Sequence, residues 1–187
     1  VTFAAALRSI LRQDPDIIMI GEMRDFETAH IGVQSSLTGH LVLSTLHTND
    51  SVGAIVRLID MGIEPFLAAS SMIGTVAQRL VRRVCPQCRE KSADVPAMLA
   101  KQGVRAVYRG RGCDYCMNTG YRGRVGLYEQ FLVTEEIREA IAESKASSVL
   151  RDMARKSGFR TIWEIGLDAV ARGLTTPEEL ARVAGDE

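Results

Sequence analysis

Two identical cysteine pairs constrain the fold of this chain more than any other feature. They read Cys85-Pro-Gln-Cys88 and Cys113-Asp-Tyr-Cys116, with 24 residues between the pairs. A two-residue gap lets both thiolates of one tight turn point at a single ion, and two such turns complete a tetrahedral four-thiolate site. The pattern therefore predicts one structural zinc ion, held in a closed site that has no open position for catalysis.

Two other uses of the cysteines are alternatives. Two disulfides are compatible with the same spacing, but the sequence shows no export signal, which favours reduced cysteines. A redox-active C-x-x-C needs only one pair, so the duplication argues against that use.

Hydrophobic residues make up 46% of the chain and charged residues 25%, the composition of an ordinary soluble globular protein. No apolar run approaches the length of about 18 residues that a membrane span needs.

The first half of the chain alternates between strand and helix patterns. Two short continuous apolar runs, Ile17–Ile20 and Leu41–Thr45, are typical of strands buried on both faces of a parallel sheet. Helical spacing is expected over residues 3–13, 27–37, 51–60 and 66–78. The alternation predicts an α/β layer built on a parallel sheet.

The second half contains helix-start signals after the cysteine segment. Residues 125–133 are expected to form a strand. Thr134 is expected to cap a helix over 135–144, and Ser147 or Ser148 to cap the next helix, which ends near Gly158. Two further helices are expected near 161–172 and 177–183, the last with Thr176 as its cap and Pro177 at its first position.

Charge is unevenly distributed along the chain, although the net charge is zero. Residues 79–124 carry eleven basic and three acidic side chains, a net of +8, and the segments on either side each carry a net of −4. A basic block of this kind can meet phosphate, anionic lipid or an acidic protein face. The alternative is a solvated surface without a partner.

Polar side chains follow both predicted strands. Glu22 comes just after the first strand, and His47, Thr48 and Asn49 follow the second. Ligands of parallel α/β sheets bind at the carboxyl ends of the strands, where an acid can orient or deprotonate a water that attacks a phosphate. The alternative for Glu22 is a helix cap or a surface residue.

Two further polar residues, Asp25 and His40, fit structural roles. Asp25 is expected to cap the helix that follows it. His40 lies at the other end of the second strand from His47, where a hydrogen bond to a backbone carbonyl is the alternative to a functional role.

The chain lacks one element that phosphate chemistry usually needs. No run of the form G-x-x-x-x-G-K-[ST] occurs, so nothing here is expected to cradle the β- and γ-phosphates of a nucleotide. The chain also begins at Val1 inside a helical pattern, without an initiator Met. We therefore expect it to be a fragment of a longer protein that, alone, neither binds ATP tightly nor hydrolyses it.

Several long motifs resemble one family. Residues 7–25, LRSILRQDPDIIMIGEMRD, resemble the Walker B region of the secretion ATPases of the GspE/PilB/PilT group. Residues 36–50, SLTGHLVLSTLHTND, are similar to the His box of these ATPases. Residues 77–84, AQRLVRRV, lead into the tetracysteine segment, and residues 120–129, GYRGRVGLYE, resemble the stretch that follows it in the GspE and PilB branches. The PilT branch lacks the zinc segment and is disfavoured.

The resemblance implies a fold, a division into domains and an activity. The fold would be the C-terminal part of a RecA-like α/β P-loop ATPase domain over residues 1–84, a zinc-binding subdomain over 85–128 and a helical region over 129–187. The full protein would be a hexameric ring in the cytoplasm, peripheral at the inner membrane. It would hydrolyse ATP, with Mg²⁺, to drive pseudopilus assembly in type II secretion. The alternative is type IV pilus assembly; the phrase LIDMGIEP at residues 58–65 favours the secretion branch.

The resemblance also implies residue roles and partners. Glu22 would be the Walker B glutamate that activates water, His47 the His-box residue near the γ-phosphate, and His40 the other histidine of that box. Phosphate or subunit contacts would fall to Arg8, Arg12 and Arg24, for which structural ion pairs are the alternative. Expected partners are inner-membrane secretion or pilus platform proteins and anionic lipid headgroups, without nucleic acid.

A zinc-ribbon module that binds nucleic acid or protein is the alternative from a different class. It would use the arginines of the basic block, with Tyr108, Tyr115 and Tyr121 stacking on bases. It leaves 78 residues of α/β pattern without a role, so it is the weaker hypothesis.

Overall fold

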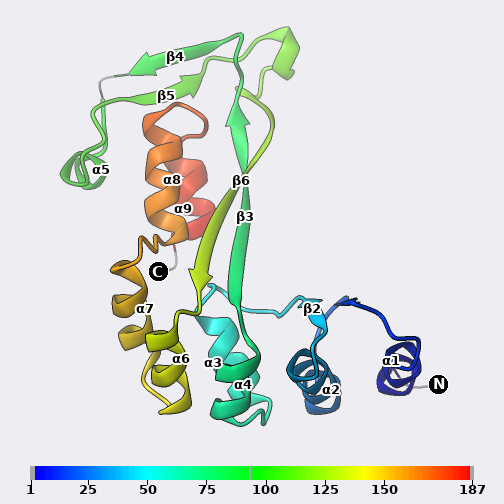
Figure 1. Ribbon diagram of the computed structural model, residues 1–187. Helices are drawn as coiled ribbons and strands as arrows, with labels where there is room; N and C mark the ends of the chain where they lie inside the picture. Colours follow the sequence, from blue (N-terminus) through cyan, green and yellow to red (C-terminus); the bar gives the residue numbers. More distant parts are fainter. Residues whose placement is uncertain (1–2, 93, 186–187) are drawn as a thin grey trace. The chain divides into compact units, whose positions relative to one another are not determined.

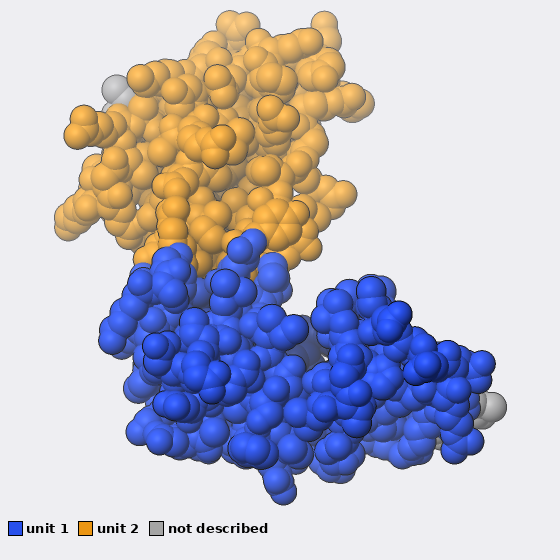
Figure 2. Space-filling view, in the orientation of Figure 1, with its two compact units in different colours: residues 1–76, 130–159 blue, residues 77–129, 160–187 orange. Residues whose placement is uncertain are grey.

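The computed structural model describes residues 3–92 and 94–185 (Figure 1). The chain forms two compact units, each made of two separate segments (Figure 2). The first unit comprises residues 1–76 and 130–159, and the second comprises residues 77–129 and 160–187. Strands β3 (Gly74–Val84) and β6 (Tyr121–Leu132) pair with each other, and each crosses a unit boundary. The expected domains 1–84, 85–128 and 129–187 have other limits and stay a prediction.

The first unit begins with the expected alternation. Its elements are α1 (Phe3–Leu11), β1 (Ile17–Ile20), α2 (Phe26–Leu37), β2 (Leu41–Ser44), α3 (Gly53–Asp60), α4 (Pro65–Ser71), α6 (Glu135–Ala142) and α7 (Ser147–Arg155). The two strands are parallel, with Ile17 opposite Leu41 and Ile20 opposite Ser44. The predicted α/β class and the parallel pair are therefore confirmed.

The expectation that both strands are buried on both faces is wrong for the described chain, because Leu41 and Leu43 of β2 are exposed and β1 is buried on one face only. Ile18 and Ile20 are buried, whereas Ile17 and Met19 are 61% and 78% exposed. Helices α1 and α2 supply the partners of the buried face through Leu7, Ala29 and other apolar residues. A continuously apolar sequence is typical of a strand that is covered on both faces. In the described part of the chain, only one face of this strand is covered.

A second core of the first unit joins helices that are far apart in sequence. It contains Val52 and Ile55 from the α3 region, Phe131 from β6, and Leu150 and Ala154 from α7. Phe131 meets Phe159 edge-on, with ring centroids 5.9 Å apart. Helix α4 packs against both α2 and α6. The two cores of the unit are thus adjacent, and Met72 contacts both.

The expected helix over 66–78 is wrong in its second half. Helix α4 ends at Ser71, Met72 is extended, and β3 begins at Gly74. The β-branched residues Ile73, Thr75 and Val76 favour a strand here. Gly74 permits close approach of the paired strand, because a Cβ at this position would lie 2.8 Å from the backbone oxygen of Phe131.

Three of the predicted helix starts can be compared with the structure. The Thr134 side chain accepts a hydrogen bond from the Ile137 N–H and caps α6, as predicted. Thr176 likewise caps α9, with Pro177 in the first turn. The prediction for α7 is wrong, because the extended residue before the helix is Ala146 and the helix already includes Ser147.

The second unit contains the cysteines. Its elements, besides parts of β3 and β6, are β4 (Arg89–Ser92), α5 (Ala97–Lys101), β5 (Val107–Gly110), a 3-10 turn (Asp114–Cys116), α8 (Ile162–Ala171) and α9 (Pro177–Ala184). Strands β4 and β5 are antiparallel. Val81, Leu127 and Leu180 lie in its core. Among the described residues, no helix is both long enough and apolar enough to cross a bilayer.

Candidate functional site

Glu22 and His47 meet at one edge of the β1–β2 pair. The strands are parallel, so the loops that follow them leave from the same edge. Two hydrogen bonds tie these loops together: the Thr45 hydroxyl donates to the Gly21 carbonyl at 2.7 Å, and the Met23 N–H donates to the Thr45 carbonyl at 3.1 Å. His47 Nε2 lies 3.0 Å from Glu22 Oε2.

Arg24 completes this cluster. Its Nε lies 2.6 Å from the same Glu22 oxygen, Oε2. The hydrogen bond from Arg24, followed by that from His47, holds the pKa of the Glu22 carboxyl below its ordinary value of 4.5. Glu22 is about one-third exposed, while Arg24 and His47 are largely exposed. The cluster is therefore an ionised carboxylate at an open surface, with Arg24 and His47 at its Oε2.

The other sequence-predicted residues have different surroundings. Arg8 of α1 forms an ion pair with Glu27 at 2.9 Å, and Arg12 lies exposed after the end of α1. His40 Nδ1 lies 2.9 Å from the Ser35 carbonyl oxygen, which is the backbone contact considered as its alternative. Asp25 accepts a hydrogen bond from the Thr28 N–H at 2.8 Å and caps α2, as expected.

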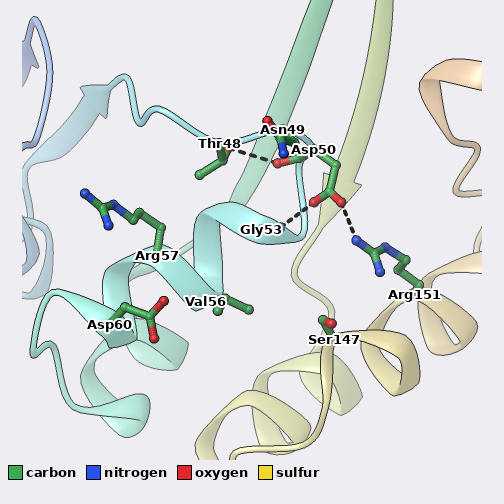
Figure 3. Close-up of a pocket in the computed structure, with 9 residues that line it drawn as sticks. All are labelled: Thr48, Asn49, Asp50, Gly53, Val56, Arg57, Asp60, Ser147 and Arg151. Atoms are coloured by element: carbon green, nitrogen blue, oxygen red, sulfur yellow. Dashed lines mark hydrogen bonds and ion pairs between the residues drawn. The ribbon is translucent and has the colours of Figure 1, made fainter. Parts of the chain in front are cut away.

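Sequence reasoning missed a contact at the far end of the loop after β2. Asp50 Oδ1 accepts the Gly53 N–H at 2.5 Å, and Asp50 Oδ2 forms an ion pair with Arg151 of α7 (Figure 3). These side chains line a pocket with Thr48, Asn49, Gly53, Val56, Arg57, Asp60 and Ser147. Asp50 and Arg151 lie 101 positions apart, so no local pattern could have indicated the pair.

The four cysteines form a candidate metal centre. The Sγ–Sγ distances are 3.9 Å for Cys85–Cys113, 3.8 Å for Cys88–Cys116 and 3.8 Å for Cys113–Cys116. All four sulfurs lie within 4.8 Å of one another. A tetrahedral zinc site with Zn–S bonds of about 2.3 Å needs sulfur separations of about 3.8 Å. The donor set fits zinc, and the separations are far longer than a disulfide bond of about 2.05 Å.

Backbone N–H groups donate to two of the sulfurs at this centre. The Gly112 N–H donates to Cys88 Sγ, and the Gly120 N–H donates to Cys116 Sγ, both at 3.3 Å. Burial alone raises the pKa of the Cys116 thiol, but N–H donors from Cys113 and Gly120 outweigh it and lower that pKa to about 6. At Cys88 burial outweighs the Gly112 N–H and raises the pKa to about 12. Gly110 lets its segment approach the segment that contains Gly120, because a Cβ at Gly110 would lie 2.0 Å from the Gly120 oxygen.

Comparisons with known proteins place the chain in one family. A family model described as "Type II/IV secretion system protein" matches residues 1–182. The chain is 55% identical over 186 residues to the "Type II secretion system protein HxcR" of Pseudomonas aeruginosa, covering 100% of this chain and 37% of that protein. It is 48% identical over 188 residues to the "Type IV pilus assembly ATPase PilB" of Thermus thermophilus, covering 96% of this chain and 21% of PilB.

Solved structures show the same fold. The pilus retraction motor PilT with bound ADP matches with a TM-score of 0.68 and 28% identity, covering 97% of this chain and 43% of PilT. The ATPase DotB of Legionella pneumophila matches with a TM-score of 0.66, covering 97% of this chain and 42% of that one; at 22% identity this shows the fold alone.

Fold and site together therefore define the class: an α/β protein of the RecA-like kind found in secretion and pilus ATPases, with a tetracysteine cluster. The chain belongs to the type II/IV secretion system protein family. The predicted resemblance to the GspE and PilB branches is confirmed. The chain spans just over a third of the length of HxcR.

Proposed function

We propose that this chain is the part of a type II secretion ATPase that activates the hydrolytic water, in an enzyme that drives pseudopilus assembly and protein export. The observation that carries this proposal is the contact between Glu22 and His47 at the carboxyl ends of two parallel strands. Identity of 55% to HxcR favours the secretion branch over pilus assembly, for which 48% identity to PilB is the specific support.

In this mechanism Glu22 is the base. Its ionised carboxylate accepts a hydrogen bond from a water, orients the water toward the γ-phosphorus and takes its proton. The water oxygen bonds to phosphorus as the bond to the bridging oxygen breaks, and ADP and phosphate leave. His47 and Arg24 both contact Oε2, and we propose that Oε1 faces the water. Magnesium, entering with the nucleotide, would neutralise phosphate charge.

The remaining predicted residues have roles around this centre. Arg24 is the arginine nearest the base, and Arg8 and Arg12 are candidates to reach phosphate or a neighbouring subunit. His40, bonded to a backbone carbonyl, shapes the turn before β2 and is the weakest of the predicted nucleotide contacts. The sequence contains no phosphate-binding loop, so we expect hydrolysis only when this chain is part of a protein of the relatives' length.

A glutamate-to-glutamine variant tests the proposal. In a protein of the relatives' full length that carries this sequence, Glu22→Gln should abolish ATP turnover and leave nucleotide binding intact, because the amide keeps the shape but cannot accept the proton. Binding is measured with a fluorescent nucleotide and turnover by phosphate release. Undiminished turnover would overturn the assignment of Glu22.

The cysteine cluster is proposed to bind one structural Zn²⁺. Bound there by Cys85, Cys88, Cys113 and Cys116, the ion would crosslink two turns of the second unit. Metal analysis of protein purified without added metal should find about one zinc per chain. A chain without zinc and with two disulfides would refute this proposal.

The nucleic-acid alternative has less support. Arginines of the basic block pair with acids of the same unit: Arg82 with Glu179, Arg109 with Glu178 and Arg111 with Glu90. The tyrosines offered for stacking each face a guanidinium of Arg82, Arg89 or Arg122 at 4.2–5.0 Å from the ring centroid. The proposed partners remain other subunits of a hexameric ring and inner-membrane platform proteins, with anionic lipid as a further candidate. The proposed location is the cytoplasmic face of the inner membrane.

A further inference from the structure

The loop that carries His47 is anchored at both ends to different cores of the first unit. At its start, the Thr45 hydroxyl and the His47 ring contact the loop after β1, a strand whose inner face packs in the core with α1 and α2. At its end, Val52 is fully buried in the core that contains Leu150 and Ala154 of α7. The position of His47 therefore depends on how both ends of the loop are held.

Asp50 makes three contacts that hold the end of the loop. One carboxylate oxygen accepts the Gly53 N–H at the start of α3, and the other forms an ion pair with Arg151. The backbone carbonyl of the same residue accepts the Thr48 hydroxyl at 3.0 Å. The Asp50 side chain is 18% exposed and that of Arg151 36%, so the ion pair is partly shielded from water. A charge-assisted hydrogen bond in such surroundings is stronger than a surface ion pair.

Helix α7 gives this contact a fixed origin. Arg151 follows Leu150, which is 2% exposed and lies in the second core. A displacement of α7 relative to that core would move the guanidinium and with it the carboxylate of Asp50. Three positions before Asp50, His47 contacts the proposed base Glu22. Arg151 contacts Asp50, whose backbone carbonyl accepts the Thr48 hydroxyl (Figure 3). Thr48 directly follows His47 in the chain, and His47 contacts Glu22.

We propose that Arg151 is a positioning residue for hydrolysis: through Asp50 it holds the loop that places His47 against Glu22, and it thereby couples α7 to the rate of turnover. This inference rests on the proposed function of Glu22 and His47. Under this proposal, α7 affects kcat but not nucleotide affinity, although none of its described contacts is with Glu22 or His47.

Hydrogen exchange of this chain tests the structural half. Arg151→Ala should speed amide exchange across residues 47–53 by about tenfold, because the loop loses its second anchor. Lys156→Ala, which removes an exposed cation just after the same helix, is the matched control and should leave that exchange unchanged. Equal exchange in Arg151→Ala and the parent chain would overturn the inference.

Steady-state kinetics in a protein of the relatives' full length test the functional half. Arg151→Ala should lower kcat about tenfold and leave KM for ATP within about twofold, the pattern of a misplaced catalytic group. Arg151→Lys should restore most of the rate, and Lys156→Ala should match the parent. A raised KM at normal kcat, or no effect on either constant, would overturn the proposal.

A double-variant cycle separates positioning from general destabilisation. Asp50→Asn keeps an oxygen that can accept the Gly53 N–H and removes the charge that pairs with Arg151, so it tests the contact even if Arg151→Ala folds poorly. The two changes should be non-additive in kcat if they break one contact; additive losses would contradict the link. If Glu22→Gln leaves turnover intact, the proposed function fails; if only the Arg151 variants are silent, this inference alone fails.

Discussion

The carboxylate of Glu179 in α9 holds Arg82 of β3 at two points, the backbone N–H and the side-chain Nε–H, each at 2.9 Å. The same buried carboxylate also accepts hydrogen bonds from Arg182 at 3.0 and 2.7 Å. Arg182, and then Arg82, lower the pKa of Glu179 to about 2 from an ordinary 4.5. This buried charge thus joins α9 to β3 within the second unit.

Glu179→Gln should therefore destabilise the chain by about 2–3 kcal/mol at neutral pH, because two guanidinium groups lose their ionised partner. A folded pKa below the ordinary value stabilises fully above about pH 4.5, and this stabilisation disappears as pH falls toward 2. The stability difference between parent and variant should shrink over that range. Denaturant unfolding at several pH values measures it.

The adjacent Glu178→Gln is the control. Glu178 pairs with Arg109 at 2.8 Å, but both side chains are more than half exposed, so the cost should stay below about 1 kcal/mol. Equal losses from the two substitutions would contradict the role given to burial of Glu179.

Gly110→Ala should disrupt metal binding. A Cβ at Gly110 would lie 2.0 Å from the Gly120 oxygen, so the two cysteine turns could not approach. We expect a loss of zinc per chain by metal analysis. Gly123→Ala is the matched control: its φ of +74° brings a backbone cost of about 1 kcal/mol, but nothing lies within 4 Å of the added methyl group. Full zinc content in Gly110→Ala would contradict the close packing of these turns.

Arg24→Gln should move the acid limb of the pH–rate profile. Arg24 is the largest cause of the lowered pKa of Glu22, so without it the carboxylate should protonate at higher pH. Because the base must be ionised, activity in a protein of the relatives' length should be lost at a higher pH than in the parent. A loss of kcat that is the same at every pH would instead indicate that Arg24 acts on the substrate.

Neighbouring side chains of β1 should differ sharply in their effect on stability. Ile20→Ala should cost about 2–4 kcal/mol, because Ile20 is 1% exposed in the first core. Met19→Ala should stay within about 0.5 kcal/mol, because Met19 is 78% exposed. Thermal unfolding of this chain distinguishes the two; a large loss from Met19→Ala would show that the outer face of the strand is covered.

Local patterns predicted much of the molecule. The strands before Gly21 and Thr45 were recognised because an apolar run is set by adjacent residues, and the cysteine site because ligand spacing within each turn is local. The helix predicted over 66–78 is wrong from Gly74 onward, because the apolar spacing there fits a strand as well as a helix. The pairing of β3 with β6 selects the strand.

What the sequence could not reveal depends on distant parts of the chain. The exposure of Met19 is set by what covers the sheet and leaves no mark in the apolar run itself. The contact of Asp50 with Arg151 joins residues 101 positions apart, and each reads alone as an ordinary surface charge. The meeting of Glu22 and His47 was predictable in outline, because parallel strands bring their carboxyl ends together.

The three crossings of the chain between its units, after residues 76, 129 and 159, have a consequence for modularity. Neither unit is a contiguous piece of sequence, so neither can be excised, duplicated or exchanged by a single cut and splice. A truncation after residue 129 would take β6 residues, α6 and α7 from the first unit and α8 and α9 from the second at once. An experiment that isolates either unit must therefore join two separate segments of the chain with a new linker.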